Sequence, residues 1–106
     1  MEEFERVDMR VARVLAVDEF PEARKPSYKL TLDLGRLGVR RSSAAIRNFY
    51  SKEELVGRQV VCVVNFPPRR IAGFDSEVLC LGAVEGDGRV RMLRPDPDAT
   101  PGTRIA

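Results

Sequence analysis

The 106-residue sequence contains no histidine and no tryptophan, and it has only two cysteines. Without histidine it lacks the side chain that most often acts as a general base, and it lacks the usual nitrogen ligand of zinc sites. It also carries no P-loop and no GxSxG motif, which mark nucleotide-binding sites and hydrolase nucleophiles. These absences predict a protein that is not an enzyme and that uses no metal or cofactor.

The two cysteines, Cys62 and Cys80, do not have CxxC spacing. Each lies inside a short apolar run, at residues 60–64 and 78–81. A free buried cysteine packs as a small apolar side chain. We therefore expect both thiols to fill the core, in preference to redox or metal chemistry.

Long apolar runs are also missing, because no stretch approaches the roughly 20 residues that cross a bilayer. The first residues, MEEFER, are acidic and lack the apolar segment of a secretion signal. The net charge of +2 is too small to predict nucleic-acid binding by itself. We expect a cytoplasmic protein that does not insert into a membrane.

The length suits a single domain, over residues 1–106. Apolar residues recur at alternate positions in short segments, a pattern typical of half-buried strands. In the first segment the alternation changes phase near Val14 and Leu15, which indicates a β-bulge. We expect a turn at 86–88 and strands over residues 9–17, 28–34, 39–46, 59–64, 77–84 and 90–93.

Between the third and fourth strands, Ser51 and Glu54 have the spacing of a capping box, and Gly57 follows three residues later. This pattern predicts a short helix with Ser51 as its N-cap and glycine at its end. A five-stranded barrel with a helix after its third strand is the plan of the OB-fold. The sequence thus predicts an all-β, five-stranded OB-fold barrel with a short helix and small terminal extensions.

The connection at residues 66–74 is unusually apolar for a loop, and it also carries two adjacent prolines and two adjacent arginines. Loops lie on the surface and often hold function. Its apolar side chains either plug the end of the barrel or line an exposed pocket with the arginines at the rim. The second interpretation predicts a peptide-binding site composed of Phe66, Arg69, Arg70, Ile71 and Phe74.

A second candidate site lies on the third strand, where Arg40-Arg41 precede Ser42-Ser43. Alternation places Arg40 with Ser42 on one face and Arg41 with Ser43 on the other. The outward pair either meets a phosphate or carboxylate group or is simply a solvated strand face. Asn65, at a strand end, is either a turn former or a ligand contact. Asp75 and Glu77 are expected to be exposed acids of a turn.

Six ordered segments resemble the CsaA family of export-related chaperones, a branch of the wider tRNA-binding-domain family. These segments are residues 7–14 (VDMRVARV), 25–35 (KPSYKL with DLG), 41–44 (RSSA), 54–60 (ELVGRQV), 65–74 (NFPPRRIAGF) and 76–79 (SEVL). Within them, Ala12 replaces a usual glycine, Ala72 takes a basic place, and Val78-Leu79 replace Gly-Met. These departures favour the chaperone branch.

The resemblance implies an OB-fold homodimer in the bacterial cytoplasm that binds unfolded precursor proteins and the translocation ATPase SecA. We expect two copies to pair through terminal segments that include the proline-rich residues 95–106. The wider family uses the same barrel for tRNA. The alternative function is therefore tRNA binding, at a site composed of Arg40, Arg41, Ser42, Asn65 and Ser76.

Overall fold

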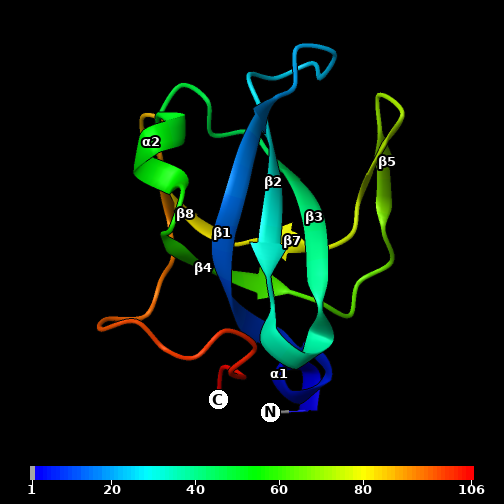
Figure 1. Cartoon of the computed structure of the whole chain (residues 1–106), viewed down its shortest axis with the longest axis vertical. Helices are drawn as coiled ribbons and strands as arrows, with labels where there is room; N and C mark the ends of the chain where they lie inside the picture. Colours follow the sequence, from blue (N-terminus) through cyan, green and yellow to red (C-terminus); the bar gives the residue numbers. More distant parts are fainter. Residues whose placement is uncertain (1) are drawn as a thin grey trace.

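A five-stranded antiparallel sheet curls into a nearly closed barrel, with the strand order β3-β2-β1-β4-β7 (Figure 1). The computed structural model describes residues 2–106, so Met1 of the predicted domain lies outside the described residues. Helix α2 lies between β3 and β4, and the all-β OB-fold prediction is confirmed. In chain order, the elements are α1 (Glu2–Arg6), β1 (Met9–Glu19), β2 (Tyr28–Asp33), η1 (Gly35–Leu37), β3 (Val39–Ala44), α2 (Lys52–Leu55), β4 (Gln59–Val63), β5 (Arg69–Ile71), β6 (Phe74–Ser76), β7 (Leu79–Cys80), β8 (Gly82–Val84) and β9 (Val90–Met92).

Strand β1 is shared by both halves of the barrel. Its first half pairs with β4 and its second half pairs with β2, and the register shifts between Val14 and Ala16. A bulge bends a strand and increases its twist. The bend allows β1 to pair with both β4 and β2, which run in different directions. The predicted bulge is confirmed.

The core lies inside this barrel. The burial of β2 alternates, with Tyr28, Leu30 and Leu32 inward, whereas every residue of β4 is buried. Leu55 of α2 is fully buried against the same cluster and covers one end of the barrel. None of the helices within residues 2–106 is long and apolar enough to cross a bilayer.

The predicted capping box is present at the start of α2. The Ser51 hydroxyl accepts a hydrogen bond from the Glu54 amide, and the Glu54 carboxylate accepts one from the Ser51 amide. Beyond the helix, Gly57 has a φ of 87°, a left-handed conformation that glycine adopts without steric cost. Both predicted ends of this helix are confirmed.

We expect Ser51→Ala to lower the free energy of unfolding by about 1 kcal/mol, because it leaves a helix amide without its partner. The Glu54 pKa is lowered from its ordinary value of 4.5, first by the backbone hydrogen bond from Ser51. The contribution of the Glu54 carboxylate to the cap is therefore present above pH 4.5 and is lost as the pH falls through the lower folded-state pKa, whereas the bond to the Ser51 hydroxyl does not titrate. Urea titrations at neutral and acidic pH measure this. A Glu54→Gln variant that loses as much stability at acidic pH as at neutral pH would contradict the contribution of the carboxylate.

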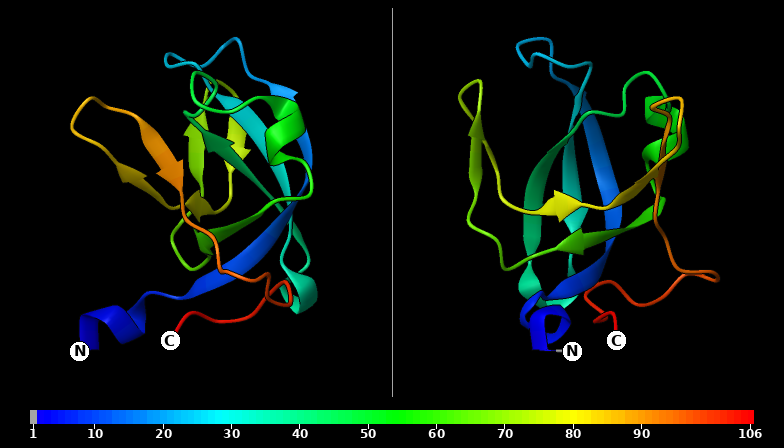
Figure 2. Two further views of the ribbon diagram at one scale, coloured as in Figure 1. Left: turned by 90° about the vertical axis from the view of Figure 1, so that its left-hand side faces the viewer. Right: turned by 180° about the vertical axis from the view of Figure 1, so that it is seen from behind.

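Residues 66–74 are not a simple loop, contrary to the prediction. Strands β5 and β6 form a hairpin that stands beside the barrel, with Ile71 opposite Phe74 (Figures 1 and 2). Its two turn residues, Ala72 and Gly73, have φ angles of 46° and 80°. Two successive positive φ angles define the type I′ hairpin turn, for which Asn-Gly is the usual sequence. Because alanine occupies the first position, the sequence does not signal the turn.

The single strand predicted for residues 77–84 is also wrong, because it divides between two partners. Strand β7 pairs with β4, and β8 pairs with β9. Between them, the Leu81 amide donates to Val61 and its carbonyl accepts from the Leu93 amide. A Cβ on Gly82 would lie 2.7 Å from a Val90 methyl group, so glycine permits the close approach of β8 to β9. The predicted turn at 86–88 connects these two strands, which confirms it.

The C-terminal segment runs along β1 of its own chain, where Figure 2 shows it beside the N-terminal half of that strand. The Val11 amide donates to the Thr103 carbonyl over 2.9 Å, and the Ile105 amide donates to the Met9 carbonyl over 2.8 Å. The segment therefore extends the sheet on the free edge of β1's first half.

Candidate functional site

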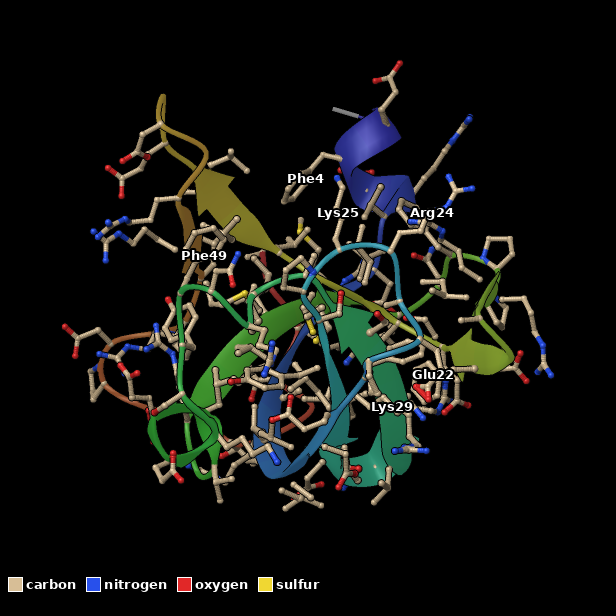
Figure 3. All side chains as sticks on the ribbon, turned by 90° about the horizontal axis from the view of Figure 1, so that it is seen from above. Phe4, Glu22, Arg24, Lys25, Lys29 and Phe49 are labelled. Carbon is tan, nitrogen blue, oxygen red and sulfur yellow. The ribbon has the colours of Figure 1, made fainter. Side chains whose placement is uncertain are left out.

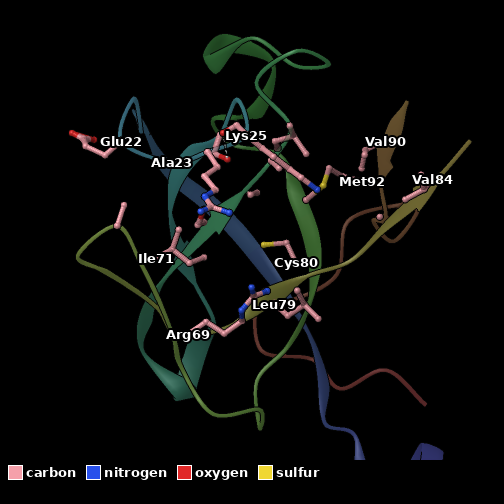
Figure 4. A pocket seen from close by; sticks show the side chains of 18 residues that line it. Glu22, Ala23, Lys25, Arg69, Ile71, Leu79, Cys80, Val84, Val90 and Met92 are labelled. Atoms are coloured by element: carbon pink, nitrogen blue, oxygen red, sulfur yellow. Dashed lines mark hydrogen bonds between the residues drawn. The ribbon is translucent and has the colours of Figure 1, made fainter. Parts of the chain in front are cut away.

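A groove of about 750 Å³ opens where the loop between β1 and β2 faces the two hairpins. Figure 4 shows its side chains, which come from segments far apart in the sequence. Figure 3 looks onto the same end of the barrel, where that loop carries Glu22, Arg24 and Lys25. The apolar side chains that line the groove include Ile46, Ile71, Leu79, Val84, Val90 and Met92.

The apolar lining is graded from floor to rim. Ile46 and Met92 are buried and form part of the barrel core. Leu79 is 41% exposed and Val84 is 71% exposed, although both are large apolar residues. Exposed aliphatic groups at the edge of a concave surface lose unfavourable contact with water when a ligand covers them. The groove can therefore bind apolar side chains.

Charged side chains at the rim are mostly cationic. Arg24 and Lys25 lie on the loop between β1 and β2, and Arg69 lies on β5, with Glu22 as the acidic member. Cations at a rim attract carboxylates or phosphates, and their aliphatic stems add apolar contact area. The groove thus combines apolar walls with a positively charged edge.

The predicted peptide-binding residues divide between different surfaces. Arg69 and Ile71 line the groove. Arg70 points to the opposite face of β5, because neighbouring strand residues alternate, and its guanidinium donates to the Asp75 carboxylate over 2.7 Å. Phe66 is 46% exposed and is not among the residues that line the groove. The predicted set is therefore not one continuous surface.

Phe74 is buried by neighbouring side chains, because only 8% of it is exposed. Its ring meets Phe20 edge to face, with 5.4 Å between the ring centroids and an interplanar angle of 64°. The Lys29 ammonium lies 4.8 Å from the Phe20 centroid, and the Arg41 guanidinium lies 4.9 Å from the Phe74 centroid. Such cation–aromatic contacts are attractive. These four residues form what we call the cation–aromatic cluster, on the outer face of β2, β3 and β6.

Two of the predicted tRNA contacts instead help to close the barrel. The buried Ser42 hydroxyl donates to the Val78 carbonyl over 2.8 Å, and the buried Ser76 hydroxyl accepts from the Ser43 amide over 2.9 Å. These bonds join β3 to the segment around β6 and β7. Because both side chains are buried and hydrogen-bonded, neither lies on a surface that tRNA can reach.

Glu77 completes this closure, although its sequence context predicts an exposed acid of a turn. Its carboxylate accepts a hydrogen bond from the Arg41 amide over 2.9 Å, and its own amide donates to the Arg41 carbonyl over 2.8 Å. Backbone amides away from water need hydrogen-bond partners. On the edge of β3 that does not pair with β2, the Glu77 carboxylate supplies the partner of the Arg41 amide. No local sequence signal points to this role, because Glu77 and Arg41 are 36 positions apart in the chain.

The remaining predicted tRNA residues differ in their roles. The Asn65 side chain accepts from the Asp8 amide over 2.9 Å and donates to the Arg6 carbonyl over 2.6 Å. Asn65 therefore ties the end of β4 to the start of β1. Arg40 is half-buried on the face of β3 that carries Ser42, whereas Arg41 lies outward in the cation–aromatic cluster and 3.5 Å from the Asp18 carboxylate.

Over residues 2–106, no three His, Cys, Asp or Glu side chains come together in a way that could hold a metal ion. Near the cation–aromatic cluster, Asp75 pairs with Arg70, and Glu77 accepts a hydrogen bond from the Arg41 amide.

Comparisons with known proteins agree with this architecture. The family described as "Putative tRNA binding domain" matches residues 9–104. The crystal structure of chaperone CsaA from Bacillus anthracis str. Ames is 48% identical, with a TM-score of 0.94 over 99% of this chain and 96% of that one. The CsaA chaperone protein from Picrophilus torridus is also 48% identical, with a TM-score of 0.93 over the same shares.

The same domain occurs within a much larger enzyme. Methionine–tRNA ligase 1 of Sorangium cellulosum is 41% identical over 105 residues, which is 99% of this chain but 15% of that enzyme. The chain thus spans only 15% of the length of this relative. On the family match and the likeness to the two chaperones, the chain belongs to the tRNA-binding-domain family, in its CsaA-like group.

Proposed function

We propose that this protein is a chaperone whose groove binds extended apolar segments of unfolded proteins. The observation that carries the proposal is the groove itself, in which Leu79 and Val84 remain exposed above a buried apolar floor. Burial of one aliphatic or aromatic side chain contributes roughly 1.5–3 kcal/mol. Binding at one such groove is therefore weak and tolerant of sequence, as a chaperone of many clients requires.

The likeness to the CsaA proteins supports further details of this proposal. We propose that the clients are unfolded precursor proteins destined for export, that SecA is a partner, and that the protein works in the cytoplasm. We also propose a homodimer that forms through the terminal segments. In support, Phe4 is 39% exposed and joins Val7 and Ile105 in lining a depression of about 290 Å³ at the two termini. Two copies would present two grooves to one client, which raises the overall affinity.

The groove can be tested by placing charge on its walls. We expect Ile71→Asp combined with Val84→Asp to weaken the binding of a labelled apolar peptide at least tenfold, since about 1.4 kcal/mol corresponds to tenfold. Fluorescence anisotropy at equilibrium measures the change. The matched control is Leu15→Asp combined with Val39→Asp, which carries the same charge on exposed apolar positions that do not line the groove. Equal affinities of the two double variants would refute the groove as the site.

A second candidate function, tRNA binding, is favoured by one specific observation. Lys29 and Arg41 lie over the rings of Phe20 and Phe74 on the outer face of the barrel, and contacts with phosphate groups require lysine or arginine side chains. Such binding would weaken steeply between about 50 mM and about 200 mM salt, whereas apolar peptide binding would change little. Two results together would identify tRNA as the ligand of the cation–aromatic cluster. Arg41→Glu would abolish tRNA binding, and Ile71→Asp combined with Val84→Asp would leave peptide binding at the wild-type level.

A further inference from the structure

Cys62 and Cys80 face each other directly across the β4–β7 pair. Their sulfur atoms lie 3.6 Å apart, and both are free thiols. The neighbouring pair, Val61 and Leu81, is joined by a hydrogen bond from the Leu81 amide to the Val61 carbonyl. Because hydrogen-bonded and non-hydrogen-bonded pairs alternate in antiparallel sheets, the cysteines occupy a non-hydrogen-bonded pair, where Cα atoms are about 4.5 Å apart. Disulfides span Cα distances of about 4.4–6.8 Å.

The two thiols differ in their access to solvent. Cys62 is fully buried in the core cluster, whereas Cys80 is half-buried and lines the groove, where Figure 4 shows its sulfur among the lining side chains. A small reagent that enters the groove therefore meets Cys80 first. The contact between the two sulfur atoms lowers the pKa of Cys80, while that same contact and burial raise the pKa of Cys62.

We propose that Cys62 and Cys80 form a reactive dithiol, which a small disulfide entering the groove oxidises to an intramolecular disulfide. The Cys80 sulfur attacks one sulfur of the reagent, which forms a mixed disulfide and releases one reagent thiolate that takes the Cys80 proton. The Cys62 sulfur then attacks the Cys80 sulfur, which forms the Cys62–Cys80 bond. The second reagent thiolate leaves and takes the Cys62 proton, so that two electrons pass from the protein to the reagent.

This reaction converts a thiol in the lining of the groove into part of a cross-strand bond between β4 and β7. The sequence alone predicts that both cysteines are passive core residues, and only the strand register brings them together. Any folded copy of the chain holds the two thiols in this arrangement, whichever ligand the groove binds.

The test uses the folded protein and glutathione disulfide, followed by acid quenching, alkylation and intact-mass measurement. The wild type is expected to lose both thiols together and to retain no glutathione, and peptide mapping is expected to find a Cys62–Cys80 link that dithiothreitol reverses. Cys62→Ala is expected to retain one glutathione on Cys80. Cys80→Ala is expected to react at least about tenfold more slowly, because the remaining thiol is buried.

The mapping of the wild type needs no variant, so it remains decisive if either alanine variant folds poorly. A stable glutathione adduct on the wild type would overturn the proposal, because it would show that Cys62 does not displace it. Failure of the folded wild type to react would overturn it equally, since it would show that Cys80 cannot be reached from the groove.

Discussion

Replacement of Gly102 with alanine is expected to lower the free energy of unfolding by about 2–4 kcal/mol and to loosen the C-terminal segment from β1. Gly102 has a φ of 90°, and a Cβ there would lie 2.6 Å from the Leu34 carbonyl oxygen. That oxygen belongs to the backbone, so it cannot move aside as a flexible side chain could. The substitution therefore combines a strained conformation with a steric clash.

The expected loosening can be located by hydrogen exchange. The Val11 amide donates to Thr103 and the Ile105 amide donates to Met9, so both amides should exchange faster when the segment detaches. Gly88→Ala is the matched control, because Gly88 has a φ of 87° but an added Cβ would meet nothing within 4 Å. We expect that control to cost only about 1–2 kcal/mol. Equal losses in both variants would show that the contact with Leu34 is unimportant.

Phe74→Ala is expected to lower the free energy of unfolding by about 3–5 kcal/mol, as removal of a buried aromatic side chain does. The substitution leaves a cavity against Phe20 and removes the ring over which Arg41 and Lys29 lie. Urea denaturation, followed by circular dichroism, measures the loss. In this structure Phe74 is therefore a stability determinant, although its sequence context predicts a ligand contact.

Phe66→Ala provides the comparison, because this ring is 46% exposed and does not line the groove. A surface substitution of this kind usually changes stability by less than about 0.5 kcal/mol. We expect Phe74→Ala to lower the free energy of unfolding several times more than Phe66→Ala, although both variants lose the same ring. A small loss for Phe74→Ala would contradict the burial that separates the two rings.

Local features of this chain could be predicted from its sequence because their causes are local. The change of phase in the apolar alternation at Val14-Leu15 predicts the bulge in β1, and the spacing of Ser51 and Glu54 predicts the start of α2. Both signals depend on residues within a few positions of each other, where alternation and capping chemistry act. The order of these elements was then sufficient to predict an OB-fold barrel.

The hairpin at β5–β6 shows where such reasoning fails. Ala72 adopts a positive φ without the asparagine or glycine that normally signals it. Alternation along β5 then places Ile71 in the groove and Arg70 outside it, but this separation follows only once the segment is known to be a strand. The sequence therefore identified part of the candidate site and combined it with residues from another surface.

From its sequence alone, this protein is determined to be an all-β barrel with a short capped helix, because periodicity and capping act between near neighbours. The groove and the Cys62–Cys80 pair arise only in three dimensions, since their members are distant in the chain. The physical reason is that alternation tells which face of a strand a side chain occupies. It does not tell which strand lies opposite, and that depends on how the barrel closes through Ser42, Ser76 and Glu77.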